Sequence, residues 1–302
     1  MNDTTASLSR KISSASDLQS VVRTMKAMAA SSISQYERSV RALTDYSRTV
    51  ELGLGVCFRD REPPADLPRN ADMRSIGAVV FGSDQGLVGQ FNDVVADHAI
   101  RCLADMPGVP QVWAVGERVH ARLADAGLQV TGLFNVPNSV KAITPLIGHI
   151  LVGYETRQEK VESDELYLFY NRPTAGAVYG AVDQRLLPLD KIWYRNLAVR
   201  PWPTRNVPEV IGGGNATMQV LIREYLFVSL FRACAESLAS ENASRLAAME
   251  RADTNIDELL ENLIASFHRL RQRGIDEELF DVISGFEALI APDTRPDGQS
   301  SR

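Results

Sequence analysis

The chain has 302 residues, of which 45% are hydrophobic and 23% are charged, and its formal net charge is -6. This composition is typical of a globular protein with room for two structural units. The acidic balance excludes the basic surface that nucleic acids or anionic membranes require, and no apolar run approaches the roughly 18 residues of a membrane span. We therefore expect neither nucleic-acid binding nor direct membrane insertion.

The cysteines and the first residues favour a cytoplasmic protein. Before Leu8 the sequence is short and polar, without the apolar core of a secretory signal. Cys57, Cys102 and Cys234 are an odd number at wide separations, with no CxxC motif and no nearby histidine set. The sequence predicts reduced thiols, with no disulfide framework and no metal site.

The prolines divide the chain into three parts. All fourteen lie between Pro63 and Pro208 or at Pro292 and Pro296. Because proline is costly inside a helix, both ends are left to form long helices. The stretch from Thr217 to Ile290 would reach roughly 110 Å as one helix, too long to be wrapped inside this protein alone.

A coiled-coil seam is predicted for a first helix from Leu8 to about Phe58. Fourteen positions alternate in steps of four and three, and eleven of them are apolar or aromatic. They are Leu8, Ile12, Ala15, Gln19, Val22, Lys26, Ala29, Ile33, Tyr36, Val40, Leu43, Ser47, Val50 and Leu54. At Gln19 and Lys26 the apolar residue comes one place earlier, at Leu18 and Met25, which predicts apolar surface beside the seam.

A matching seam runs along the last helix. Its positions are Met249, Ala252, Ile256, Leu259, Leu263, Phe267, Leu270, Ile275, Leu279, Val282, Phe286 and Leu289. Two terminal helices with matching seams most simply pair antiparallel. The second helix is longer by about two dozen residues, so its end is predicted to project as a single exposed helix.

The middle of the chain reads as an α/β domain. Strands are expected at 75–81, 111–115, 128–136, 165–170 and 177–187, and helices at 91–106, 117–126 and 139–155. This alternation predicts a Rossmann-like sheet with an antiparallel edge, followed by a turn-rich connection from Pro188 to Asn215. The predicted domains are a coiled-coil helix at 1–62, an inserted α/β domain with its connection at 63–211, and a coiled-coil helix with its tail at 212–302.

The glycine-bearing turn from Gly82 to Asn92 is the main chemical signal. A turn between a strand and a helix can aim backbone N–H groups at a phosphate. Its glycines do not make GxGxxG, and no Gly-Lys-Ser/Thr follows, so the spacing favours a tight turn with positive φ. The four histidines are scattered, and nothing indicates a catalytic set.

A basic patch and an apolar tip follow each other near the end of the last helix. Arg269, Arg271 and Arg273 flank Gln272 just before Gly274. The patch can be a solvated helix face, but it lies where the helix is expected to lose its partner. The tip has the apolar residues Phe280, Val282, Ile283, Phe286 and Leu289. Such residues must be buried in something else, which implies a partner protein.

Three motifs resemble the gamma subunit of rotary F-type ATP synthases. They are SDQGLVG at Ser83–Gly89, TMKAMAAS at Thr24–Ser31 and ESLASENASRLAAM at Glu236–Met249. Arg271-Gln272 and Ile283-Ser284-Gly285 are similar to the C-terminal signature of that family. The resemblance spans nearly the whole chain.

The resemblance implies a central rotor shaft that couples ion flow to ATP synthesis or hydrolysis on the beta subunits. The shaft itself would be non-catalytic and without a cofactor. Its partners would be the alpha and beta subunits, the epsilon subunit and the membrane c-ring, at the cytoplasmic face of a bacterial inner membrane. By the same resemblance, Arg271, Gln272, Glu241 and Arg245 would contact the catch loops of beta subunits, and Met25 and Lys26 would face the beta-subunit lever.

The chain also departs from the family pattern. Gln85 and Val88 stand where Arg and Cys are usual, and the connection from Pro188 to Asn215 lacks the cysteine pair of a redox switch. These departures suggest a divergent bacterial branch, for which the alternative, sodium-linked F-ATPase is a candidate.

Two other function classes remain open from the residues alone. One is an α/β nucleotide-binding enzyme with coiled-coil arms, for which the isolated chain should bind nucleotide. The other is a coiled-coil scaffold, which should form a stable dimer.

Overall fold

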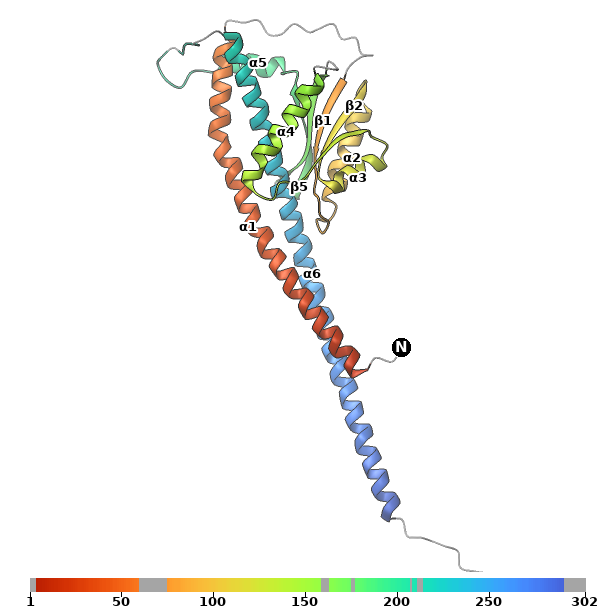
Figure 1. Cartoon of the computed structure of the whole chain (residues 1–302). Helices are drawn as coiled ribbons and strands as arrows, with labels where there is room; N and C mark the ends of the chain where they lie inside the picture. The colour runs from red at the N-terminus through yellow and green to blue at the C-terminus, as the bar shows by residue number, and fades with distance from the viewer. Residues whose placement is uncertain are drawn as a thin grey trace, which may run out of the picture. The chain divides into compact units, whose positions relative to one another are not determined.

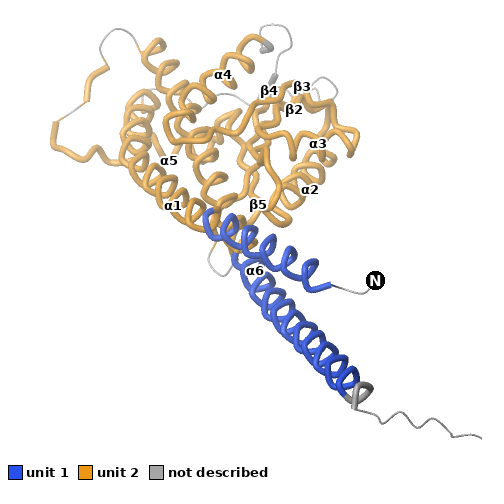
Figure 2. The backbone as a smooth tube through the Cα atoms, turned by 60° about the horizontal axis from the view of Figure 1, so that its bottom comes forward, with its two compact units in different colours: residues 1–24, 250–302 blue, residues 25–249 orange. Residues whose placement is uncertain are grey.

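The computed structural model describes residues 4–59, 75–158, 163–174, 177–206, 208–210 and 214–290. Its contacts divide the chain into two compact units, which are coloured separately in Figure 2. The larger unit is Met25–Met249, and the smaller unit combines Met1–Thr24 with Glu250–Arg302. The predicted segments 1–62, 63–211 and 212–302 follow the order of the chain instead, and they stay a prediction.

The larger unit contains a five-stranded sheet in the order β3-β2-β1-β4-β5. Its strands are β1 (Ser75–Phe81), β2 (Val109–Val115), β3 (Val130–Phe134), β4 (Ser163–Thr174) and β5 (Ala177–Leu187). The first four are parallel, and β5 is antiparallel to β4 at one edge. Residues 76–81 of the central strand are all buried, as expected of a parallel strand covered on both faces. The predicted α/β class and antiparallel edge are confirmed.

Helices cover both faces of this sheet. On one face, α2 (Phe91–Ala104) and α3 (Glu117–Asp125) pack against β1 and β2, and Val80, Val95 and Val119 lie in their shared core. Figure 1 shows α2 and α3 on the same side of the strands. On the other face, α4 (Val140–Gln158) buries Ile147 with Leu230 of the last helix. Helix α4 continues through Pro145, as predicted.

A short helix, α5 (Lys191–Ala198), lies in the predicted turn-rich connection. The carboxylate of Asp190 caps it by accepting a hydrogen bond from Ile192 N at 3.2 Å. Its Tyr194 ring stacks on Phe58, with ring centroids 3.9 Å apart. A Cβ added at Gly55 would lie 2.5 Å from Leu197 O, so this close approach requires glycine. The sequence analysis did not predict this helix, because the flanking prolines obscured its cap.

The two long helices, α1 (Thr5–Phe58) and α6 (Gly214–Ile290), contribute to both units. All fourteen seam positions predicted on α1 are buried or half-buried. Within the larger unit, Tyr46 Oη donates to Glu224 Oε2 at 2.8 Å, and a Cβ at Gly53 would lie 3.1 Å from Leu221. Residue numbers fall along α6 as they rise along α1, so the helices pair antiparallel here.

The same antiparallel pairing holds in the smaller unit. Gln19 Nε2 donates to Asp257, and Arg23 Nε donates to Asp253 Oδ1 at 3.1 Å. Gln19 can therefore occupy a seam position although it is polar, because its side chain is hydrogen-bonded to Asp257 of the facing helix. Leu18 beside it is 54% exposed, which confirms the predicted apolar surface next to the seam.

The seam of α6 passes through Leu260 and not through Leu259, which was the predicted position. Leu260 is half-buried, whereas Leu259 is 49% exposed. Met249, Ile256 and Leu263 keep their predicted inward places. Steps of three and four join Ile256 to Leu263 through either leucine, so the partner helix and not the spacing decides which one faces the seam.

The last part of α6 has no α1 beside it. Extending the register of the Arg23–Asp253 pair places Thr5, the first residue of α1, level with Arg271. Residues 275–286 are all exposed, so the predicted single-helix end is confirmed there. Among the helices in the described ranges, none combines the length and the apolar character needed to cross a membrane.

Candidate functional site

The turn between β1 and α2 is held by its own side chains. Asp84 accepts hydrogen bonds from Glu117 N at 3.0 Å and from Val136 N at 2.9 Å. Glu117 begins α3, so the Asp84 carboxylate occupies the helix N-terminus where a bound anion would otherwise lie. Asp84 therefore caps the N-terminus of α3 and places a negative charge in the turn, which disfavours a phosphate there.

The rest of the turn is likewise fixed from within. Ser83 N donates to Asn92 Oδ1 at 2.9 Å, and Asn92 Nδ2 donates back to Ser83 Oγ at 2.8 Å. Leu87 and Gly89 adopt positive φ angles of 63° and 56°. The prediction of a tight turn with positive φ is confirmed, although one of the two residues is a leucine.

Helix α6 is attached to this turn through Ser244. Its hydroxyl donates to Val88 O at 2.6 Å, and the bond is buried. Ser244 belongs to the segment Glu236–Met249, the longest of the motifs that carry the family resemblance. In the structure this motif is a packing surface, by which the long helix holds the α/β sheet. Sequence analysis assigned no role to Ser244, because its partner is a backbone carbonyl far away in the chain.

Glu241 and Arg245 form a buried ion pair in the same segment. Arg245 Nη2 donates to Glu241 Oε1 at 2.7 Å, and the two side chains are 14% and 7% exposed, respectively. Burial raises the pKa of the Glu241 carboxyl, and Arg245 counteracts this rise. The second oxygen, Oε2, accepts no hydrogen bond from the described part of the chain. The pair thus lies inside the larger unit, and its predicted contact with a partner stays a prediction.

Arg271 and Gln272 are exposed on the smaller unit. Gln272 Nε2 donates to Asp276 Oδ1 at 3.1 Å, one turn further along α6. The four residues predicted to contact beta subunits therefore form two separate pairs: Glu241 with Arg245 in the larger unit, and Arg271 with Gln272 in the smaller one. Only the second pair presents its side chains to solvent.

The apolar tip is exposed on every described side chain. Phe280 is 68% exposed, Val282 70%, Ile283 44% and Phe286 64%. Leu289 lies in α6, but its side chain is outside the described residues. This apolar surface can be covered by another molecule.

Met25 and Lys26 are half-buried on α1 in the larger unit. Met28, one turn further on, is 66% exposed and continues the apolar surface beside the seam. The predicted contact of Met25 and Lys26 with a lever is not tested by these positions.

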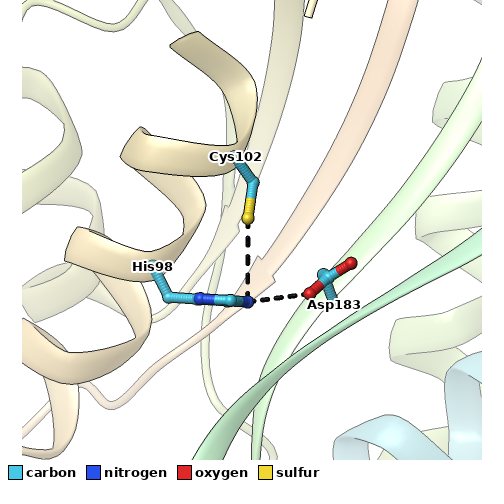
Figure 3. Close-up of side chains that lie close together, drawn as sticks. All are labelled: His98, Cys102 and Asp183. Carbon is cyan, nitrogen blue, oxygen red and sulfur yellow. Dashed lines mark hydrogen bonds and ion pairs between the residues drawn. The ribbon is translucent and has the colours of Figure 1, made fainter. Parts of the chain in front are cut away.

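One cluster was missed by the sequence analysis. His98 and Cys102, one turn apart on α2, converge with Asp183 of β5, as Figure 3 shows. His98 Nε2 lies 2.9 Å from Asp183 Oδ1 and 3.8 Å from Cys102 Sγ. The sequence analysis had not weighed His98, which stands four residues before Cys102. The spacing of His98 and Cys102 was a usable signal, whereas Asp183 arrives only through strand pairing.

The matching family model is described as ATP synthase, and it covers residues 4–289. An ATP synthase gamma chain from Nitrosomonas eutropha is 27% identical over 295 residues, covering 92% of this chain and 97% of the relative. Both comparisons extend over nearly the whole sequence, including the middle, where the motifs are thin.

Two solved structures have the same fold. A chain of the Euglena gracilis mitochondrial ATP synthase, solved as OSCP/F1/c-ring in rotational state 3, has a TM-score of 0.64 at 15% identity, covering 99% of this chain and 98% of that chain. A chain of the Tetrahymena thermophila mitochondrial ATP synthase, solved as central stalk and c-ring, has a TM-score of 0.56 at 22% identity, covering 77% and 99%. The protein therefore belongs to the gamma-subunit family of ATP synthases, whose members are non-catalytic subunits of the central stalk.

Proposed function

We propose that this chain is the rotor shaft of an F-type ATP synthase, which couples ion flow through the membrane sector to ATP synthesis or hydrolysis on the beta subunits by rotation. The observation that carries the proposal is the end of α6. There the exposed Arg271 and Gln272, followed by the apolar tip, continue past the start of α1. A helix with this surface is suited to insertion into another protein.

The proposed partners of the smaller unit are the alpha and beta subunits. Arg271 offers a charged donor and Gln272 a neutral one, and both are suited to a beta-subunit loop at one rotary angle. Two antiparallel helices of unequal length have no threefold symmetry. Such a shaft can press three catalytic sites into different conformations, which a symmetric rod cannot do.

The proposed partners of the inserted α/β segment, 63–211, are the epsilon subunit and the c-ring. The Tetrahymena and Euglena complexes that share this fold contain a c-ring according to their descriptions, which supports a rotor partner of that kind. We assign the complex to the cytoplasmic face of a bacterial inner membrane, in keeping with the bacterial relative. The sodium-linked type stays a prediction, because the coupling ion is selected in the c-ring.

The first test is assembly. The chain is co-expressed with the alpha and beta subunits of the same organism and purified through a tag on beta. We expect one copy of this chain for every three alpha–beta pairs, and a disulfide introduced between Gln272→Cys and a beta-subunit loop should stop ATP hydrolysis reversibly. A chain that forms a stable dimer and never joins the hexamer would support the scaffold instead.

The second test concerns the polar pair. Replacing both Arg271 and Gln272 by alanine removes hydrogen bonds worth about 1.5–3 kcal/mol, so coupled ATP synthesis should fall by roughly tenfold or more. The matched control is Arg269→Ala, because Arg269 is an exposed arginine of the same helix to which no subunit contact is assigned. Normal assembly with undiminished synthesis in the double variant would refute the assigned contact.

A further inference from the structure

The cluster on α2 and β5 brings three different metal-binding side chains to one point. The donor atoms of His98, Cys102 and Asp183 all lie within 4.8 Å of one another. His98 is 23% exposed and Asp183 48%, while Cys102 is half-buried. The group is therefore partly shielded by the protein and still open to solvent at Asp183. Figure 3 shows the thiol and the carboxylate approaching the same end of the imidazole ring.

This convergence exceeds what a simple ion pair requires. Both Asp183 Oδ1 and Cys102 Sγ approach one atom, His98 Nε2. That nitrogen has one hydrogen or one lone pair, so it can satisfy only one of the two partners well. A cation placed between the three donors satisfies all of them at once.

We propose that His98, Cys102 and Asp183 bind a zinc ion, with a water molecule as the fourth ligand. Imidazole nitrogen, thiolate sulfur and carboxylate oxygen are the three donor types that Zn²⁺ uses in proteins. Magnesium and calcium prefer sites made of oxygen alone, so this donor set selects against them.

His98 and Cys102 already have the spacing that zinc requires, and Asp183 must move to join them. Zinc bonds of about 2.0 Å to nitrogen and about 2.3 Å to sulfur, in a tetrahedral arrangement, place these two donors roughly 3.6 Å apart. The observed distance between His98 Nε2 and Cys102 Sγ is 3.8 Å. Asp183 must move away from His98 by a few tenths of an ångström. It must also move toward Cys102 Sγ, from which its oxygen lies within 4.8 Å, by up to about 1 Å, and its exposed side chain allows both movements.

The surroundings are consistent with such a site. The Phe169 ring meets the His98 ring edge to face, with centroids 6.2 Å apart, and this contact restricts the orientation of the imidazole.

The bound ion would tie a helix to the edge of the sheet. Strand β5 stands at one end of the strand order, where it pairs with β4 in an antiparallel arrangement. Its other side is a sheet edge, whose backbone groups have no neighbouring strand in the sheet. A bond through zinc from α2 to β5 would stabilise this edge. The inference does not depend on the rotor function.

Cobalt binding tests the site directly. The full-length chain, freed of metal and reduced, is titrated with Co²⁺ alone. We expect one equivalent to give a thiolate-to-cobalt charge-transfer band and the visible bands of tetrahedral cobalt, both abolished by competing Zn²⁺. The variant Cys102→Ser should lose the charge-transfer band. His98→Gln and Asp183→Asn should each weaken binding at least about tenfold.

Two matched controls come from neighbouring positions. His120→Gln changes a half-buried histidine of α3, and Asp97→Asn changes a half-buried acid of α2 that pairs with Arg122, so both should leave the titration unchanged. Zn²⁺ should also raise the thermal unfolding midpoint of the wild type and not that of Asp183→Asn.

Three results would overturn the proposal. They are a wild-type chain without the charge-transfer band, a band that survives Cys102→Ser, and affinity that is the same in Asp183→Asn as in Asp97→Asn. The wild-type spectrum and the exposed Asp183 keep the test decisive even if the Cys102 variant fails to fold.

Discussion

Arg245 neutralises the buried Glu241 carboxylate, and its effect on the free energy of unfolding can be measured. Burial raises the folded-state pKa of Glu241, and removing Arg245 raises that pKa further. A carboxyl with a raised folded-state pKa keeps its contribution to stability at low pH and loses it as the pH rises through that value. Arg245→Ala should therefore cost about 3 kcal/mol of unfolding free energy at neutral pH and much less near about pH 4.

Denaturant unfolding of the full-length chain at a series of pH values measures this effect. The double variant Glu241→Gln, Arg245→Ala removes the carboxylate as well, so its loss of stability should not grow with pH. An Arg245→Ala penalty that is the same at both ends of the pH range would show that Glu241 carries no buried charge.

Ser244 provides a second test at this scale. Ser244→Ala removes this buried hydrogen bond and leaves Val88 O with only the longer bond from Phe91 N at 3.2 Å, which should lower the free energy of unfolding by about 0.5–1.5 kcal/mol. Ser20→Ala is the matched control, because Ser20 is exposed on α1 and bonds only within its own helix, to Ser16 O. Equal unfolding midpoints for the two variants would contradict the role of Ser244 as an anchor.

At the scale of elements, the seam of α6 makes a sharp prediction. Leu260→Ala removes a half-buried side chain from the α1 interface and should cost about 1–2 kcal/mol, whereas Leu259→Ala at the neighbouring exposed position should cost less than about 0.5 kcal/mol. Thermal or urea unfolding of both full-length variants, followed by helical circular dichroism, makes the comparison. If Leu259→Ala were the more damaging, the register derived from Gln19 and Asp257 would be wrong.

The same pair of leucines shows how far the sequence alone could lead. Periodicity located both long helices and the strands of the sheet, because each pattern is local and repeats many times. It could not choose between two adjacent leucines, since that choice depends on the partner helix. Helix α5 was missed because a single cap at Asp190 is a weak signal among prolines.

The candidate sites divide in the same way. Arg271 and Gln272 were recognisable by their place after the expected end of pairing, and the structure leaves them exposed there. The burial of Glu241 was not recognisable, because the turn containing Asp84 and Val88 packs on it from a distant part of the chain. Asp183 meets His98 only because β5 pairs with β4, which no local pattern reveals.

At the scale of the whole molecule, the apolar tip should tolerate loss better than the polar pair. A chain that ends after Ser284 keeps Arg271 and Gln272 and removes Phe286 with the residues beyond it. In the assembled complex we expect ATP hydrolysis to change by less than about twofold, a barrier change under about 0.5 kcal/mol. Complete loss of hydrolysis in a correctly assembled truncated complex would contradict this division of roles.

Helix α1 begins level with Arg271, and this limit of the helix pair has a mechanical consequence. Two helices joined along a seam resist twisting more than one helix does, because their bonded backbones lie off a common axis and must be sheared against each other. The part of α6 that pairs with α1, before Arg271, is therefore torsionally stiff, whereas the single helix after Arg271 is compliant. Torque applied to the compliant end would be stored as elastic twist of the single helix. Torque applied at Arg271 and Gln272 would instead act where α6 is still paired with α1. The proposed contact of Arg271 and Gln272 with beta subunits would therefore exchange torque with the least lag.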